Sequence, residues 1–79
     1  MTDQILRLIY PVSLLSVPVI NQLIRRYDLT VNILRAQIGG NDRWMEVQLA
    51  GHPVVIEEAI LWLKGQGIEV QYESTKSSV

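Results

Sequence analysis

The stretch from Thr30 to Gly40 constrains the fold of this chain more than any other. Its first nine residues contain four large aliphatic side chains and a threonine, and a Gly-Gly pair then ends the run. Such a pattern is typical of a buried or half-buried strand that enters a hairpin. Asn32 lies inside the apolar run, where an amide without hydrogen-bond partners costs free energy. Asn32 is therefore the residue that most needs a functional explanation.

The hydrophobic alternation changes phase within this stretch. Val31 and Ile33 share one parity, whereas Leu34, Ala36 and Ile38 share the other. Either a β-bulge lies near Ile33, or both faces of the strand are covered at that point. A chain of 79 residues has too little material to cover both faces of a sheet, so we expect a second subunit to supply the cover.

Five further segments carry the periodicity of a strand or a helix. We predict strands over residues 5–10, 29–38, 43–50 and 68–73, one helix from Pro18 to about Tyr27, and a second helix that follows Pro53 and ends at Gly65 or Gly67. The side chains expected to face the core are Leu6, Leu8, Tyr10, Ile20, Leu23, Ile24, Tyr27, Met45, Val47, Leu49, Ile56, Ala59, Ile60 and Leu63.

This order of elements, β-α-β-β-α-β, predicts a ferredoxin-like α+β sandwich. Two right-handed crossovers joined by a hairpin give a four-stranded antiparallel sheet with both helices on one face. We expect residues 1–73 to form a single domain and residues 74–79 to be a disordered tail. Strand 29–38 falls at an edge of such a sheet, and an exposed aliphatic edge is a pairing site.

Composition excludes several classes of function. The net charge of −1 lacks the strongly basic surface of a nucleic-acid binder. The absence of cysteine removes iron–sulfur clusters, thiolate zinc sites and disulfides. No signal-peptide pattern is present, and no run approaches the about 18 apolar residues of a membrane span. We therefore expect a cytoplasmic protein without a cofactor, a nucleic-acid partner or a membrane-inserted segment.

The sequence offers no catalytic or metal-binding constellation. His52 is the only histidine, and Glu57 and Glu58 point about 100° apart on a helix, which does not give a ligand set. No nucleophile, base and orienting group can be assembled, so we expect no enzyme. Trp44 is expected on the outer sheet face, either as an interface anchor or as an exposed cross-strand residue.

These residues together resemble the NIL domain family, named for its Asn-Ile-Leu. The resemblance runs from about Leu6 to Tyr72 and rests on Val31-Asn32-Ile33-Leu34 after a helix that begins near Pro18. It also includes the second helix with Ala59-Ile60-Leu61-Trp62-Leu63. The resemblance implies a ferredoxin-like domain of the kind found at the C-terminus of the ATPase subunit of methionine ABC importers. There the domains pair, and methionine bound at the pair inhibits transport.

By the same resemblance, the role in methionine binding falls on Asn32. The chain has neither a phosphate-binding loop nor cysteine, so it carries neither the ATPase nor the iron–sulfur module of other family members. Where relatives commonly have a glycine after the first strand, it has Tyr10-Pro11-Val12. The alternative for Asn32 is an amide that caps a bulge or pairs across a subunit boundary.

Two functional hypotheses follow. The first is a regulatory module that forms a homodimer and binds methionine or a related small amino acid. The second is a protein-interaction domain that docks a transporter or iron–sulfur partner without any ligand. The candidate ligand-binding residues are Asn32, Ile33 and Leu34, and the candidate interface residues are Val31, Leu34, Ala36, Ile38 and Trp44.

Overall fold

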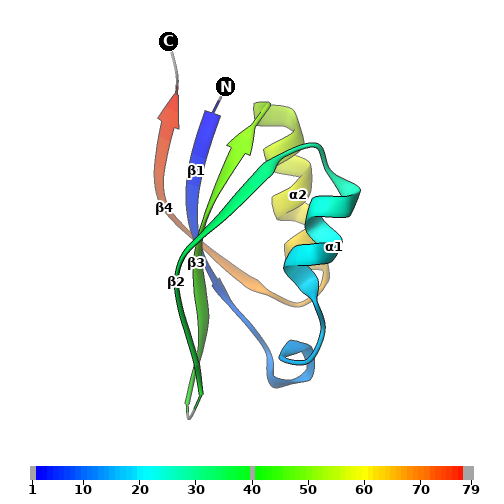
Figure 1. Ribbon diagram of the computed structural model, residues 1–79, viewed down its shortest axis with the longest axis vertical. Helices are drawn as coiled ribbons and strands as arrows, with labels where there is room; N and C mark the ends of the chain where they lie inside the picture. Colours follow the sequence, from blue (N-terminus) through cyan, green and yellow to red (C-terminus); the bar gives the residue numbers. More distant parts are fainter. Residues whose placement is uncertain (1, 40, 78–79) are drawn as a thin grey trace.

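The structure, a computed structural model, describes residues 2–39 and 41–77. The elements follow in the order β1 (Thr2–Ile9), η1 (Val12–Leu14, a 3₁₀ turn), α1 (Val19–Arg26), β2 (Thr30–Gly39), β3 (Asp42–Gly51), α2 (Pro53–Gly65) and β4 (Glu69–Ser77). The strands form one antiparallel sheet in the order β2-β3-β1-β4, and both helices cover the same face of it (Figure 1). The predicted ferredoxin-like sandwich is confirmed.

The core lies between the two helices and the inner face of the sheet. Leu6 and Leu8 of β1 are fully buried, as are Val47 and Leu49 of β3. Burying one such side chain contributes about 1.5–3 kcal/mol, so alternate positions on the central strands do much to hold the sandwich together. The helices add Val19, Leu23, Ile56, Ala59, Ile60 and Leu63 to the same core.

Proline begins α2 and immediately precedes α1. Pro53 is the first residue of α2, and Pro18 occupies the N-cap position of α1. Proline suits a helix start because the first-turn amides have no acceptor within the helix. The predicted stripe of α2 is confirmed, but Ile24 of α1 is 45% exposed although we expected it in the core. Val19 is buried in its place, because it lies four residues before the buried Leu23 and so shares its face of the helix.

Strand boundaries differ from the prediction chiefly at the two chain ends. β1 begins at Thr2, and β4 continues to Ser77 instead of ending at Glu73. The extension pairs with β1, with Thr2 opposite Ser77 in the register. The expectation of a disordered segment is therefore wrong for residues 74–77, because a backbone partner was available; residues 78 and 79 lie outside the described residues.

A bulge explains the phase change in β2. The register between β2 and β3 shifts between Ile33 and Arg35, so Leu34 is the extra residue. Val31 and Ile33 before the bulge and Ala36 and Ile38 after it all lie on the helix-facing side of the sheet. Of the two explanations that the sequence left open, the bulge is confirmed.

Candidate functional site

An apolar hollow of about 400 Å³ lies beside β2, between the sheet and the segment that leads into α1. We call it the β2 hollow. Its volume falls within the range of small-molecule pockets, which are mostly apolar with few polar groups. The lining residues on which the argument depends are Tyr10, Val17, Ile20, Ile33, Ile38 and Met45.

The edge strand next to the β2 hollow exposes large apolar side chains. Ile33 is 55% exposed, Leu34 is 43% exposed and Ile38 is 53% exposed. β2 pairs with β3 on one side only, so its other side presents backbone groups without a strand partner in the described part of the chain. Edge strands of this kind are sites where another chain can pair.

The three candidate ligand-binding residues do not meet on one face of this chain. Asn32 lies opposite Gln48 on the outer face of the sheet, whereas Ile33 lies opposite Val47 on the inner face. Ile33 lines the β2 hollow, and Leu34 occupies the bulge between the two faces. Asn32 is exposed at the edge, with Gln48 opposite it on β3 and its other side open to a second chain.

The candidate interface residues divide into two groups. Leu34, Ala36 and Ile38 are exposed along β2, as a pairing edge requires, whereas Val31 is partly buried against the core. Trp44 lies on the outer face of β3, with the Arg7 guanidinium 4.4 Å from its ring centroid. Trp44 is thus partly covered by its own chain.

The outer face carries a row of alternating charges that crosses all four strands. Arg35 of β2 donates hydrogen bonds of 3.1 and 3.0 Å to the two carboxylate oxygens of Glu46 on β3. Arg7 of β1 forms ion pairs with Glu46 at 3.7 Å and with Glu73 of β4 at 3.2 Å. We call these four residues the charge row. The bulge in β2 turns Arg35 toward this face, so the row and the bulge depend on each other.

Sequence reasoning missed the charge row. Arg7, Glu46 and Glu73 lie on outward positions of their strands, yet the side chain of Glu46 is only 9% exposed. The signal was the opposite charge of outward residues on neighbouring strands, which becomes visible only once the register is known.

The charge row shifts the acidities of its two carboxyl groups in opposite directions. The hydrogen bonds from Arg35 lower the pKa of Glu46 to about 2. The pKa of Glu73 is raised from its ordinary value, first because a hydrogen bond with Glu46 favours its protonated form and then because burial disfavours its charge.

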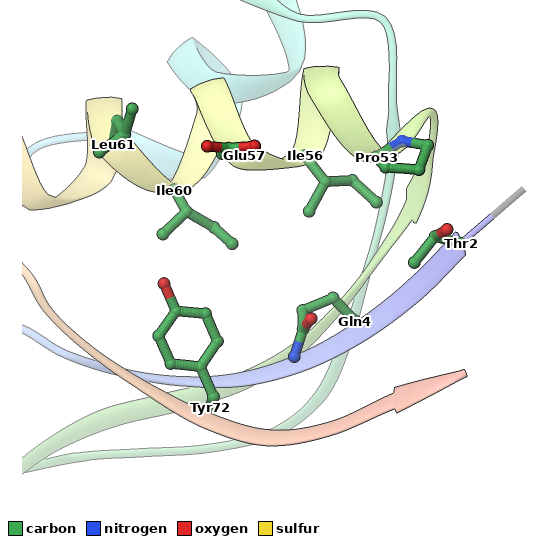
Figure 2. Close-up of a pocket in the computed structure, with 8 residues that line it drawn as sticks. All are labelled: Thr2, Gln4, Pro53, Ile56, Glu57, Ile60, Leu61 and Tyr72. Atoms are coloured by element: carbon green, nitrogen blue, oxygen red, sulfur yellow. The ribbon is translucent and has the colours of Figure 1, made fainter. Parts of the chain in front are cut away.

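A second depression, the α2–β4 groove, lies on the other side of the molecule and has a volume of about 340 Å³. Figure 2 shows Gln4 and Tyr72 rising from the strands toward Ile56 and Ile60, which point down from α2. The lining residues are Thr2, Gln4, Pro53, Ile56, Glu57, Ile60, Leu61 and Tyr72.

Within residues 2–39 and 41–77, no group of three or more histidine, aspartate or glutamate side chains could hold a metal ion. His52 precedes α2 and makes no side-chain capping hydrogen bond to it. Neither described α-helix has the length and hydropathy needed to cross a bilayer.

Comparison with protein families decides which family this arrangement represents. The model of the NIL domain matches residues 4–72, which is nearly the whole described fold. The chain belongs to the NIL domain family. The sequence resemblance around Val31-Asn32-Ile33-Leu34 is therefore confirmed.

Two relatives of this NIL domain differ greatly in length. The uncharacterized protein ssr2439 of Synechocystis sp. is 37% identical over 65 residues, which cover 80% of this chain and 67% of that protein. The methionine import ATP-binding protein MetN 1 of Paraburkholderia xenovorans is 34% identical over 74 residues. That match covers 89% of this chain but only 22% of MetN 1.

A solved structure shares the fold of the NIL domain described above. The C-terminal domain of an ABC transporter ATP-binding protein from Enterococcus faecalis superimposes with a TM-score of 0.77 and 23% sequence identity. The match covers 87% of this chain and 81% of the other. At this identity the similarity establishes the shared fold.

Proposed function

We propose that this NIL domain is a regulatory ligand-binding module. In this proposal two copies pair through their β2 edges, and a small apolar amino acid such as methionine binds in the β2 hollow at the interface. The observation that carries the proposal is the exposure of Ile33, Leu34 and Ile38 beside that hollow. Such an apolar patch, next to an unpaired strand edge, favours cover by a second chain.

The chemistry of the β2 hollow favours an apolar ligand of modest size. Ile33, Ile38 and Met45 line one side, and Val17 and Ile20 contribute from the segment around the start of α1. Asn32 lies at the same edge but on the outer face, where its amide is available to polar groups of a second copy. Because the Paraburkholderia relative is a methionine import ATP-binding protein, methionine is the first ligand to test.

Light scattering coupled to gel filtration tests the pairing. We expect a dimer for the unaltered chain and a monomer for Ile33→Glu, because a buried carboxylate without a partner opposes association. Ile24→Glu is the matched control, since Ile24 is 45% exposed on α1 and does not line the β2 hollow. If the unaltered chain is still a monomer at about 1 mM, the pairing part of the proposal is wrong.

Isothermal titration with methionine tests the ligand. We expect saturable heat, and Val17→Lys should weaken methionine binding at least tenfold, because a charged side chain in the lining of the β2 hollow opposes an apolar ligand. Norleucine is the matched ligand, since it keeps the length and replaces the sulfur. The ligand half of the proposal fails if methionine at millimolar concentration gives no heat, or if the Val17→Lys variant titrates identically.

A second candidate is a docking role without any small molecule. It is favoured by the match to MetN 1, because the domain there is part of a much longer polypeptide. The same β2 edge would then contact a transporter or an iron–sulfur protein. Leu34→Lys and Trp44→Glu should abolish co-purification of a defined partner, and a thermal shift by methionine would argue against this candidate.

The proposal assigns the domain a binding role rather than a catalytic one, and it needs no cofactor. The match to an importer ATP-binding protein supports a cytoplasmic location for the module. Turnover of any substrate that depends on residues of the β2 hollow would contradict this part of the proposal.

A further inference from the structure

We propose that the α2–β4 groove and the β4 edge together form a second docking site. Its occupant is an extended segment of a partner protein in which apolar and basic residues alternate. The segment adds a fifth strand at β4 and places one apolar side chain in the groove. Addition of a strand to a sheet edge is an established mode of peptide recognition.

The backbone of β4 provides the first part of the site. β4 is the last strand of the sheet and pairs only with β1. Along Glu69–Ser77 its other side therefore has no strand partner in the part of the chain that the structure describes. No helix lies over that side of β4 in Figure 1, so an extended segment can approach it.

The α2–β4 groove provides an anchor for an apolar side chain next to that edge. Tyr72 of β4 is 57% exposed although it points to the helix side of the sheet, and Leu61 of α2 is 61% exposed. Ile56 and Ile60 form a buried floor between them. Figure 2 shows the Tyr72 ring standing toward Ile60 at the β4 side of the groove.

The charges around the site select a basic partner. Glu69 lies on the outer face of β4, where its carboxylate accepts a hydrogen bond of 2.8 Å from Gln71 Nε2 and keeps its charge, and Glu57 lines the α2–β4 groove. Lys64 is engaged locally, because its Nζ donates a hydrogen bond of 3.3 Å to the Tyr72 Oη. An added strand whose outward side chains are lysine or arginine would face Glu69, and opposite charges across neighbouring strands stabilise the pair.

A second copy of this chain is the alternative occupant. Symmetric pairing of two β4 strands centred on Gln71 would set Glu69 of one copy opposite Glu73 of the other, and like charges on neighbouring strands are destabilising. The assembly state of the unliganded chain tests the other registers. The site is also separate from the β2 edge, because β3 and β1 lie between the two edges of the sheet.

The probe is a fluorescein-labelled six-residue peptide in which lysine and valine alternate, measured by fluorescence anisotropy with the full chain. We expect saturable binding that weakens as salt is added. Leu61→Glu should weaken binding at least tenfold, whereas Val54→Glu should leave it unchanged, since Val54 is equally exposed on α2 but does not line the groove.

Reversal of the charge of Glu69 tests whether the peptide binds at the β4 edge. Glu69→Lys should weaken binding of the lysine peptide at least tenfold and should allow binding of a peptide that alternates glutamate and valine. Glu58→Lys changes the net charge equally at an exposed position of α2 outside the groove, and it should have no such effect. Circular dichroism confirms that each variant is folded.

Amide hydrogen exchange supplies the decisive readout. Bound peptide should slow exchange of β4 amides that do not pair with β1, and it should leave β2 amides unchanged. Three outcomes overturn the proposal: equal loss of binding in Glu58→Lys and Glu69→Lys, binding without protection of β4, or an unliganded assembly larger than a dimer that Leu61→Glu dissolves. The last outcome would show that another copy of the chain occupies the site.

Discussion

Glu46 accepts two hydrogen bonds from Arg35 and faces Arg7, while its own side chain is only 9% exposed. A carboxylate held in this way favours the folded state when it is ionised. Its pKa is lowered to about 2, so its contribution is complete above the ordinary value of 4.5 and is lost as the pH falls through 2. Glu73, whose pKa is raised, contributes in the opposite sense.

The two carboxyl groups therefore act in different pH ranges. For Glu73 the stabilising form is protonated, so its contribution is present below 4.5 and is lost as the pH rises through its raised pKa. The loss of stability in acid below 4.5 belongs to Glu46.

We predict that Glu46→Gln makes the stability of the domain depend less on pH in acid. The variant should have a lower urea midpoint than the unaltered chain at pH 7, because Arg35 and Arg7 lose their shared anion. Its midpoint should change less between pH 4.5 and pH 2, since the titrating group is gone. Urea titrations at both pH values measure the difference. Glu58→Gln is the control, and equal pH slopes for Glu46→Gln and the unaltered chain would contradict the assignment.

Single residues also show where sequence reasoning reached its limit. Leu6, Leu8 and the stripe of α2 from Ile56 to Leu63 could be assigned to the core, because period alone decides which side faces inward. The partners of Arg35 could not be assigned, because cross-strand contacts depend on register, and the register here contains a bulge. That Asn32 and Ile33 face opposite sides of β2, in contrast, follows from the alternation of a strand and could be predicted from the sequence.

At the scale of elements, β2 combines an edge position, an exposed aliphatic surface and a bulge. The bulge places Leu34 at the edge and keeps Arg35 opposite Glu46. Bulges occur often at sheet edges, where they redirect side chains. The sequence predicted an irregularity near Ile33. A bulge and a strand that is covered on both faces give the same pattern of side chains, so only the structure could decide between them.

Deletion of Leu34 should produce a regular β2 that still folds. Ile33 and Arg35 would then occupy consecutive positions opposite Val47 and Glu46, so the register on both sides is retained. We expect a free energy of unfolding within about 1 kcal/mol of the unaltered chain, as for surface changes that leave the core intact. Chemical denaturation checks this value.

Deletion of Ala36 is the matched comparison. It removes one residue from the paired part of β2, so Gln37 and Ile38 exchange faces. This variant should lose more stability than the Leu34 deletion, because Ile38 leaves the helix-facing side and Gln37 takes an inward position in the pairing with β3. If the two deletions destabilise equally, Leu34 is not the extra residue of the strand.

At the scale of the whole molecule, the charge row and the two depressions occupy three separate parts of the surface. The β2 hollow and the α2–β4 groove lie on the helix-facing side at opposite edges of the sheet, and the charge row occupies the outer face. The elements that separate the two edges, β3 and β1, carry the most completely buried residues of the sheet. Binding of a partner at the β2 edge therefore does not require β4 to move, and the reverse also holds.

Pairing through β2 makes thermal stability depend on concentration. If the domain dimerises, its melting temperature should rise with protein concentration, because association stabilises the folded chain by mass action. Ile33→Glu should melt at one temperature over a hundredfold range of concentration, and Ile24→Glu should behave like the unaltered chain. Scanning calorimetry makes the comparison, and a concentration-independent melting temperature of the unaltered chain would contradict pairing.

The register that sets Thr2 opposite Ser77 has a consequence for how such a domain can be combined with others. Figure 1 shows the start of β1 and the end of β4 at the same end of the sheet. A host protein could therefore carry the fold as an insert within one of its surface loops, with short connectors on either side. Joining the two ends directly would likewise convert β4 and β1 into a hairpin and permit new ends to be opened elsewhere.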